Sequence, residues 1–181
     1  MRTSKRDRIV AGALELAHRD GFDTLTFDSL AEHVGLTRGG IIYHFRTKTD
    51  LLEGIANAFF ERWRTEALEA LGKPIAQASR AERIEALVRS VVDGEILPGE
   101  VSFMLSATPE AEMLKDAWNA LRREWVGEIS ELTSMQRVAL LAVDGWWANR
   151  AVDSDSQDLD DPEIAELIVS LARGEHARGQ Q

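Results

Sequence analysis

The sequence contains no cysteine, so disulfide bonds and thiolate metal sites are excluded. A chain without cysteine is typical of a reducing compartment. The start of the chain has no apolar run of signal-peptide length, and no stretch approaches the roughly 20 apolar residues of a membrane span. We therefore expect a cytoplasmic protein with no membrane partner.

The sequence motifs of enzymes and metal sites are also missing. The four histidines do not have the spacing of metal ligands, and there is no nucleophile motif, phosphate-binding loop or dinucleotide fingerprint. Five aspartates between residues 153 and 161 indicate a solvated acidic loop, with a weak divalent-cation site as the alternative. We predict that the protein is not an enzyme and needs neither a cofactor nor a metal.

No segment shows the alternating apolar and polar residues of a half-buried strand, and there is no internal repeat. Apolar residues instead recur at helical spacing, as at Ile84, Leu87 and Val88. Glycine and proline separate the helical segments, most clearly at residues 72–74 and 98–99. The composition, 44% hydrophobic and 29% charged, is that of a globular protein. The sequence therefore predicts an all-α fold.

Residues 26–48 show the pattern of two helices joined by a tight turn. Apolar residues at helical spacing precede Gly35, which lies where a left-handed cap ends a helix. Thr37 then has the position of an N-cap for a short second helix. Gly39 and Gly40 in that helix cost roughly 1 kcal/mol each relative to alanine, so they indicate a backbone that must approach another surface closely. This is the helix-turn-helix arrangement, whose second helix lies in the DNA major groove.

The net charge of −10 is unevenly distributed along the chain. Residues 1–50 carry eight Lys and Arg against seven Asp and Glu, whereas the rest carries thirteen against twenty-four. Nearly all the acidity therefore lies outside the helix-turn-helix region. An acidic body suppresses non-specific DNA binding and leaves affinity to a few positioned contacts.

The run GLTRGGIIYHF from Gly35 to Phe45, followed by Thr47, Lys48 and two leucines, resembles the DNA-binding signature of the TetR family of bacterial transcriptional regulators. The resemblance covers roughly residues 5–60. One departure is an isoleucine directly before Tyr43, where many relatives carry an aromatic residue.

The resemblance implies a DNA-binding domain at residues 1–46 and a helical effector-binding and dimerisation domain at residues 47–181. A long helix at residues 47–71 would link them. The expected function is that of a homodimeric repressor, released from a palindromic operator in double-stranded DNA by a small molecule. Two alternatives remain, an activator or effector-independent regulator, and a helical protein-interaction module without DNA binding.

The residues expected to contact DNA lie at the starts of helices and along the short second helix. Arg38 is expected to pair with guanine or with a phosphate. Tyr43 and His44 are placed to contact phosphates, and the resemblance assigns a backbone contact to Lys48. The alternative is a packing unit in which Tyr43 and His44 are semi-buried surface residues. The full set is Thr26, Thr37, Arg38, Gly39, Gly40, Tyr43, His44 and Lys48.

Large apolar side chains in the second part of the chain are candidates for an effector pocket. Relatives bind small, often apolar or planar ligands between the helices of the body, and aromatic side chains suit such sites. We therefore expect an apolar or aromatic effector of unknown identity. Ordinary core packing is the alternative for each residue. The candidates are Phe59, Trp63, Phe103, Met104, Met113, Trp118 and Trp125.

The segment at residues 138–152 is apolar on nearly all sides, and such a helix must be covered on more than one side. With the last helix it resembles the dimer interface of the family, a four-helix bundle formed by two subunits. A central helix within a monomer is the alternative. The expected interface residues are Leu140, Leu141, Val143, Trp146, Trp147, Ile164, Leu167, Ile168 and Leu171.

Overall fold

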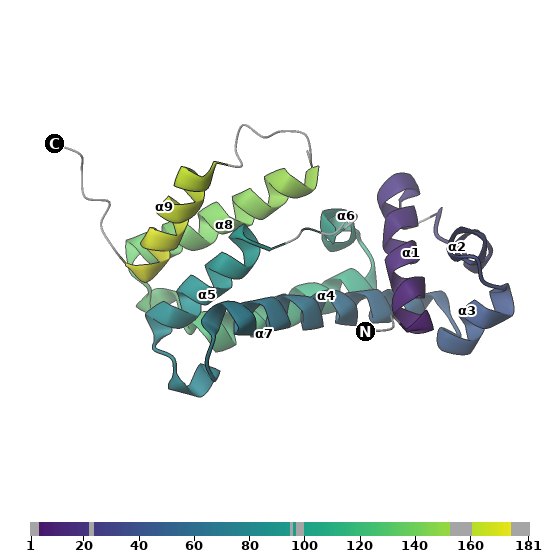
Figure 1. The fold of residues 1–181 in the computed structure, drawn as a ribbon, viewed down its shortest axis with the longest axis horizontal. Helices are drawn as coiled ribbons and strands as arrows, with labels where there is room; N and C mark the ends of the chain where they lie inside the picture. Colours follow the sequence, from purple (N-terminus) through teal and green to yellow (C-terminus); the bar gives the residue numbers. More distant parts are fainter. Residues whose placement is uncertain (1–3, 22–23, 95, 97–99, 153–160, 175–181) are drawn as a thin grey trace. The chain divides into compact units, whose positions relative to one another are not determined.

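The computed structural model describes residues 4–21, 24–94, 96, 100–152 and 161–174. In these ranges the regular elements are all helices, which confirms the predicted all-α fold. Four of the five aspartates of the acidic loop, at positions 153, 155, 158 and 160, lie outside the described residues. The α-helices are α1 (Lys5–Asp20), α2 (Phe27–Val34), α3 (Arg38–His44), α4 (Lys48–Leu71), α5 (Arg80–Val92), α6 (Glu100–Leu105), α7 (Pro109–Val126), α8 (Ser134–Val152) and α9 (Pro162–Arg173) (Figure 1).

Side-chain caps start several of these helices. The hydroxyl oxygens of Ser4, Thr26 and Ser79 each accept a hydrogen bond from the backbone N–H three residues further on. Asp161 caps α9, which begins with Pro162 at its first position. Each such cap is worth about 1 kcal/mol, so the boundaries of these helices are set by local sequence.

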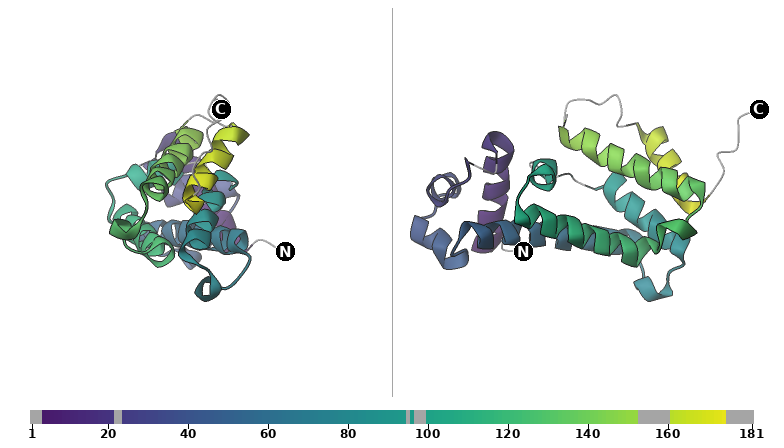
Figure 2. Two further views of the ribbon diagram at one scale, coloured as in Figure 1. Left: turned by 90° about the vertical axis from the view of Figure 1, so that its left-hand side faces the viewer. Right: turned by 180° about the vertical axis from the view of Figure 1, so that it is seen from behind.

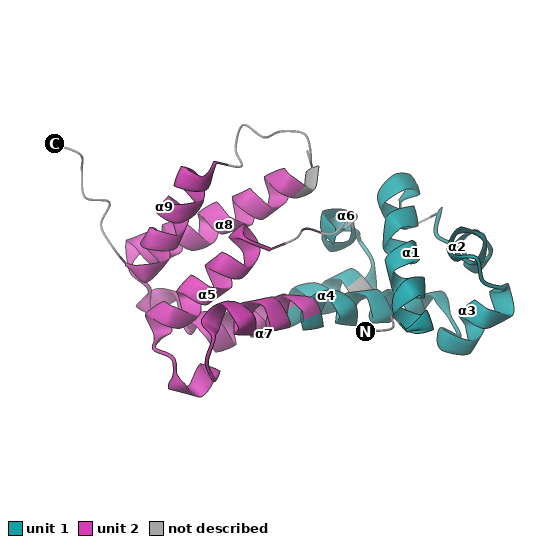
Figure 3. Cartoon of the chain, in the orientation of Figure 1, with its two compact units in different colours: residues 1–61, 97–117 teal, residues 62–96, 118–181 magenta. Residues whose placement is uncertain are grey.

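The helices form two compact units (Figure 3). Unit 1 comprises residues 1–61 and 97–117, and unit 2 comprises residues 62–96 and 118–181. Helices α4 and α7 each contribute residues to both units. The domain boundary expected after residue 46 stays a prediction.

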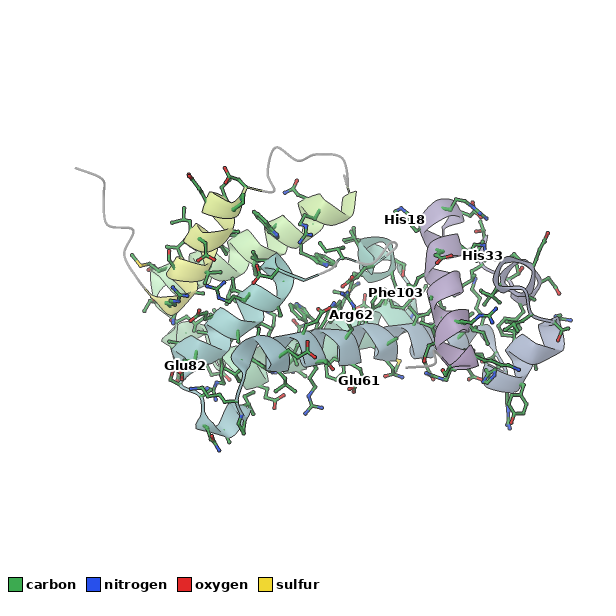
Figure 4. The ribbon with its side chains drawn as sticks, viewed as in Figure 1. His18, His33, Glu61, Arg62, Glu82 and Phe103 are labelled. Atoms are coloured by element: carbon green, nitrogen blue, oxygen red, sulfur yellow. The ribbon has the colours of Figure 1, made fainter. Side chains whose placement is uncertain are left out.

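Unit 1 is built on α1, α2, α3 and the first part of α4. At Gly12, α1 lies so close to α2 that an added Cβ would overlap with Cγ1 of Val34. The carboxylate of Glu15 on α1 lies 2.7 Å from Nε2 of His33 on α2, labelled in Figure 4. Helix α6 also packs on α1. The fully buried side chains of unit 1 include Ile9, Leu30, Ile41, Leu51, Ile55, Phe59 and Phe103.

In unit 2, α5, α8 and α9 pack against one another and appear side by side in each view (Figure 2). Their shared core includes Leu87, Leu140 and Val169. At its edge, the guanidinium of Arg173 on α9 lies 2.7 Å from the carboxylate of Glu85 on α5. Among the described helices, none is both long and apolar enough to cross a membrane.

Candidate nucleic-acid interface

The turn between α2 and α3 is fixed by two local contacts. Gly35 has φ 66° and ψ 39°, a left-handed conformation that a residue with a Cβ adopts at a cost of roughly 1–2 kcal/mol. Its N–H bonds the carbonyl oxygens at the end of α2. Thr37 then starts α3, where its hydroxyl oxygen accepts the N–H of Gly40 at 3.0 Å. The sequence therefore enforces a helix, a turn and a second helix within these residues.

Helix α3 has one buried side and one exposed side. Ile41 and Phe45 are 0% and 2% exposed and belong to the core of unit 1. Tyr43 is 84% exposed, and its ring meets that of His44 edge to face, with ring centroids 5.1 Å apart. An aromatic ring this exposed buries almost no apolar area within the subunit, so it is available to a binding partner.

The two glycines of α3 differ in their surroundings. A Cβ at Gly39 would meet no atom of the described residues within 4 Å, so packing among them does not require glycine there. A Cβ at Gly40 would lie 3.3 Å from the hydroxyl oxygen of Thr37. A binding partner can therefore approach the backbone closely at Gly39, near the start of α3.

Thr26 and Lys48 flank this surface in the sequence, at the starts of α2 and α4. The Thr26 hydroxyl oxygen accepts the N–H of Ser29 at 3.1 Å, and Thr26 remains exposed at the positive end of the α2 dipole. Lys48 is exposed as the first residue of α4. Both positions suit phosphate contacts. All eight residues expected to contact DNA lie in unit 1, and their roles stay predictions.

Sequence reasoning missed the charged residue that contacts Arg38. Nε of Arg38 lies 3.4 Å from Oδ1 of Asp28, which stands in the first turn of α2. An acidic residue in a first turn is explained by the helix dipole alone, so its sequence position gave no further signal. The contact arises only when the turn brings the starts of α2 and α3 together.

Two arginines near the N-terminus also have contacts within unit 1. The guanidinium carbon of Arg6 lies 5.0 Å from the centroid of the Phe45 ring, a cation–π geometry. Nη2 of Arg8 donates to the carbonyl oxygen of Val34 at 2.6 Å, at the end of α2. These cations therefore hold the helix-turn-helix against α1.

The seven effector-pocket candidates are divided between the units and differ in burial. Phe59 and Phe103 pack together in unit 1 with ring centroids 6.0 Å apart, and both are fully buried. In unit 2, Trp125 is also fully buried, whereas Trp63 and Trp118 are half-buried with centroids 5.0 Å apart. Among the candidates, this tryptophan pair offers aromatic rings that a small molecule could still reach, because both side chains are only half-buried. Of the two remaining, both in unit 1, Met104 is half-buried and Met113 is 52% exposed.

The expected interface residues on α8 and α9 also differ in exposure. Leu141 is 73%, Leu167 45% and Ile164 39% exposed, which is high for leucine and isoleucine. Leu140, Val143, Trp146 and Ile168 are buried inside unit 2, and Trp147 and Leu171 are half-buried.

A groove of about 400 Å³ lies on unit 2, with residues of both α8 and α9 along it. It includes Val138, which sequence reasoning did not single out and which is 50% exposed. Gly145 also lines the groove, and a Cβ there would meet nothing within 4 Å in the described part of the chain. The groove is therefore a largely apolar surface, and the exposed Ile164 and Leu167 are part of it.

The sequence of the helix-turn-helix region matches known regulators. Residues 9–55 match the family model described as bacterial regulatory proteins, tetR family. A 50-residue segment is 36% identical to the HTH-type transcriptional regulator SrpR of Pseudomonas putida, covering 28% of this chain. The match spans about a quarter of the relative's length, 24%.

Solved structures match over most of the chain. SCO4454, a TetR-family transcriptional regulator from Streptomyces coelicolor, has a TM-score of 0.63 at 19% identity, covering 93% of this chain and 92% of that one. AibR, solved in complex with isovaleryl coenzyme A and operator DNA, has a TM-score of 0.64 at 18% identity, covering 93% and 97%. At these identities the likeness shows a shared fold.

Proposed function

We propose that the chain, whose residues 9–55 match the TetR family of bacterial regulatory proteins, is a homodimeric cytoplasmic repressor of that family, released from a palindromic operator by a small molecule. The observation that carries this proposal is the surface of α3. Tyr43 is 84% exposed and Gly39 has open space above its backbone, so both are unexplained by packing within the subunit. A DNA groove explains both, and a catalytic role has no support in these residues.

Recognition of the operator divides between base and backbone contacts. Thr37 and Arg38 stand at the N-terminal end of α3, from which a recognition helix reaches base edges. Arg38 there pairs with guanine or a phosphate. Tyr43 and Lys48 contact phosphates and fix the register of the helix on the duplex. Thr26 adds a phosphate contact at the start of α2, through its hydroxyl and the helix dipole.

Two copies of the domain are needed to contact both half-sites of a palindrome, roughly 34–36 Å apart. The exposed Leu141 and Leu167 support dimerisation through α8 and α9, because a second copy would remove their side chains from water. The groove that Gly145 lines supports close approach of a helix from the second copy.

The effector acts through α4 in this proposal, because that helix contributes residues to both units. A small molecule held against Trp63 and Trp118 favours a conformation in which the two DNA-binding domains of the dimer are further apart. To change operator occupancy substantially it must discriminate between the two conformations by several kcal/mol. An unchanged separation of these domains in an effector-bound structure would refute this mechanism.

The test is binding of the purified protein to its own upstream DNA at several salt concentrations, with its size measured in parallel. We expect a dimer that binds one short segment tightly and salt-dependently. Lys48→Ala should weaken binding and lower the salt slope by about one unit, because it removes one cation from a phosphate. Tyr43→Ala should weaken binding with little change in the salt slope, because its hydroxyl carries no charge.

Arg64→Ala is the matched control, since it removes a cation from an exposed position of α4 within unit 2. Unchanged DNA retention in Tyr43→Ala and Lys48→Ala would refute the assigned contacts. A genome-wide pull-down that enriches no DNA segment would refute the regulatory function itself.

A further inference from the structure

Arg38 and Asp28 form an ion pair within the surface that carries the expected DNA contacts. Nε of Arg38 lies 3.4 Å from Oδ1 of Asp28, and their side chains remain 63% and 75% exposed. Arg38 is the first residue of α3 and Asp28 the second of α2, so the pair joins the starts of both helices. Pairs this exposed add little to stability, so stability alone does not account for this contact.

The position of Arg38 is unfavourable for α3 considered alone. The N-terminal end of a helix carries partial positive charge and favours anions, yet the first turn of α3 contains no acidic residue. Asp28 supplies a negative charge to this end from the neighbouring helix. Its own place in the first turn of α2 suits an anion.

The contact also fits recognition of a base by Arg38. A bidentate contact to O6 and N7 of guanine requires two N–H donors. The closest approach of the pair is between Nε of Arg38 and Oδ1 of Asp28. A guanidinium has five N–H donors, so a carboxylate at Nε leaves further donors of the same group for a base.

We propose that Asp28 is a positioning residue that holds Arg38 for one guanine of the operator and weakens binding to other DNA. This inference rests on the proposed function. By restricting the Arg38 side chain before binding, the carboxylate reduces the conformational entropy lost in the complex. Its negative charge also repels phosphates wherever Arg38 finds no guanine, so affinity for random DNA falls more than affinity for the operator.

The test begins with selection of an operator from a random DNA library by the full-length wild-type protein. Each base pair of that operator is then substituted, and binding is measured for wild type, Asp28→Asn and Arg38→Ala. Asp28→Asn should bind random DNA more tightly, and its discrimination at one base pair should fall about tenfold. Arg38→Ala should lose discrimination at the same base pair.

Three further variants separate positioning from other effects. Asp28→Glu keeps the charge and should restore part of the lost discrimination. Glu32→Gln removes one charge from an exposed position of the same helix and should change neither property. In the Arg38→Ala background, Asp28→Asn should have no further effect on discrimination.

If Asp28→Asn lowers discrimination further in the Arg38→Ala background, Asp28 itself contacts the base, and the inference is overturned. If Glu32→Gln changes binding as much as Asp28→Asn does, the effect comes from net charge alone, and the inference is also overturned. A selected operator with unchanged discrimination in Asp28→Asn would overturn it while leaving the proposed function intact. A wild-type protein that selects no DNA sequence would overturn both.

Discussion

The hydroxyl oxygen of Thr37 lies 3.0 Å from the backbone nitrogen of Gly40 and accepts its N–H hydrogen bond. The same oxygen limits the residue at position 40, because a Cβ there would lie only 3.3 Å from it. At Gly39 a Cβ would meet none of the residues that the structure describes within 4 Å. The two adjacent glycines therefore have different explanations. Gly40 leaves room for the capping hydroxyl of Thr37, whereas Gly39 faces a surface that an external partner can approach.

We expect Gly39→Ala to stabilise the protein and to weaken DNA binding. Alanine in a helix is about 1 kcal/mol more favourable than glycine, which corresponds to a rise of about 2–4 °C in Tm for a chain of this size. In the complex the added methyl group would stand between the backbone and the groove. Thermal unfolding and operator titration of the same preparation measure both effects. A Gly39→Ala variant with raised Tm and unchanged DNA affinity would contradict the proposed approach of α3.

Thr37→Val should destabilise unit 1 by about 1 kcal/mol, because valine has the shape of threonine but no oxygen for the Gly40 N–H. Thr37→Ser keeps the oxygen and should lose much less. Denaturant unfolding of the pair separates the cap from side-chain volume. If both variants unfold at the wild-type midpoint, the cap does not contribute to stability.

Gly12→Ala should destabilise the protein, unlike the same substitution at Gly39. The new Cβ would overlap with Cγ1 of Val34, so α1 and α2 must move apart or Val34 must leave its rotamer. Overpacking of this kind costs about 1–3 kcal/mol, more than the helix propensity of alanine returns. Chemical unfolding of Gly12→Ala and Gly39→Ala side by side gives the comparison. Equal stability changes of the two variants would show that α1 and α2 yield easily at this point.

The parts of the fold that depend on neighbouring residues were predictable from sequence. Gly35 and Thr37 act on helix ends within a few residues of themselves, so their types and positions sufficed. The contacts of Arg38 with Asp28 and of Arg173 with Glu85 join helices, and they depend on packing that no local pattern encodes.

The apolar pattern of α8 also shows what local sequence cannot predict. It predicted a helix covered on more than one side, but it did not separate Leu140, buried within unit 2, from Leu141, which is 73% exposed. A helix that is apolar on nearly all sides gives no periodicity from which its inner and outer faces can be distinguished. The division between core and exposed surface therefore required the structure.

Glu82 should make the stability of unit 2 depend on pH in the acidic range. Hydrogen bonds from Lys73 and from the Ser79 N–H and hydroxyl lower the pKa of this carboxyl to about 2. Because the folded pKa lies below the ordinary value of about 4.3, the contribution is fully present above that value. It is lost as the pH falls through about 2.

Glu82→Gln should therefore flatten the loss of stability between about pH 4.3 and 2. Unfolding midpoints measured across this range for wild type and variant provide the comparison. Glu69→Gln, at an exposed position of α4 in unit 2, is the matched control for loss of one carboxylate. If the unfolding midpoints of wild type and Glu82→Gln decrease equally as the pH falls, Glu82 does not make this contribution to stability.

Leu141→Asp should weaken the dimer without unfolding the subunit. The side chain is 73% exposed in the subunit, so aspartate there stays hydrated and costs the monomer little. In the proposed interface the same carboxylate would lose its water, and we expect the dimer dissociation constant to rise about 100-fold or more. Sizing across a range of concentrations measures this change.

Ile129→Asp is the control for Leu141→Asp, because Ile129 is 53% exposed and lies outside α8 and α9. Leu141→Asp should also lose affinity for a full palindrome while keeping the weak affinity of one domain for a half-site, since two domains on one duplex reinforce each other only when joined. A stable Leu141→Asp dimer with wild-type operator affinity would place the dimer interface away from this leucine. A folded monomer whose remaining affinity does not depend on the second half-site would tie operator binding to dimerisation through α8.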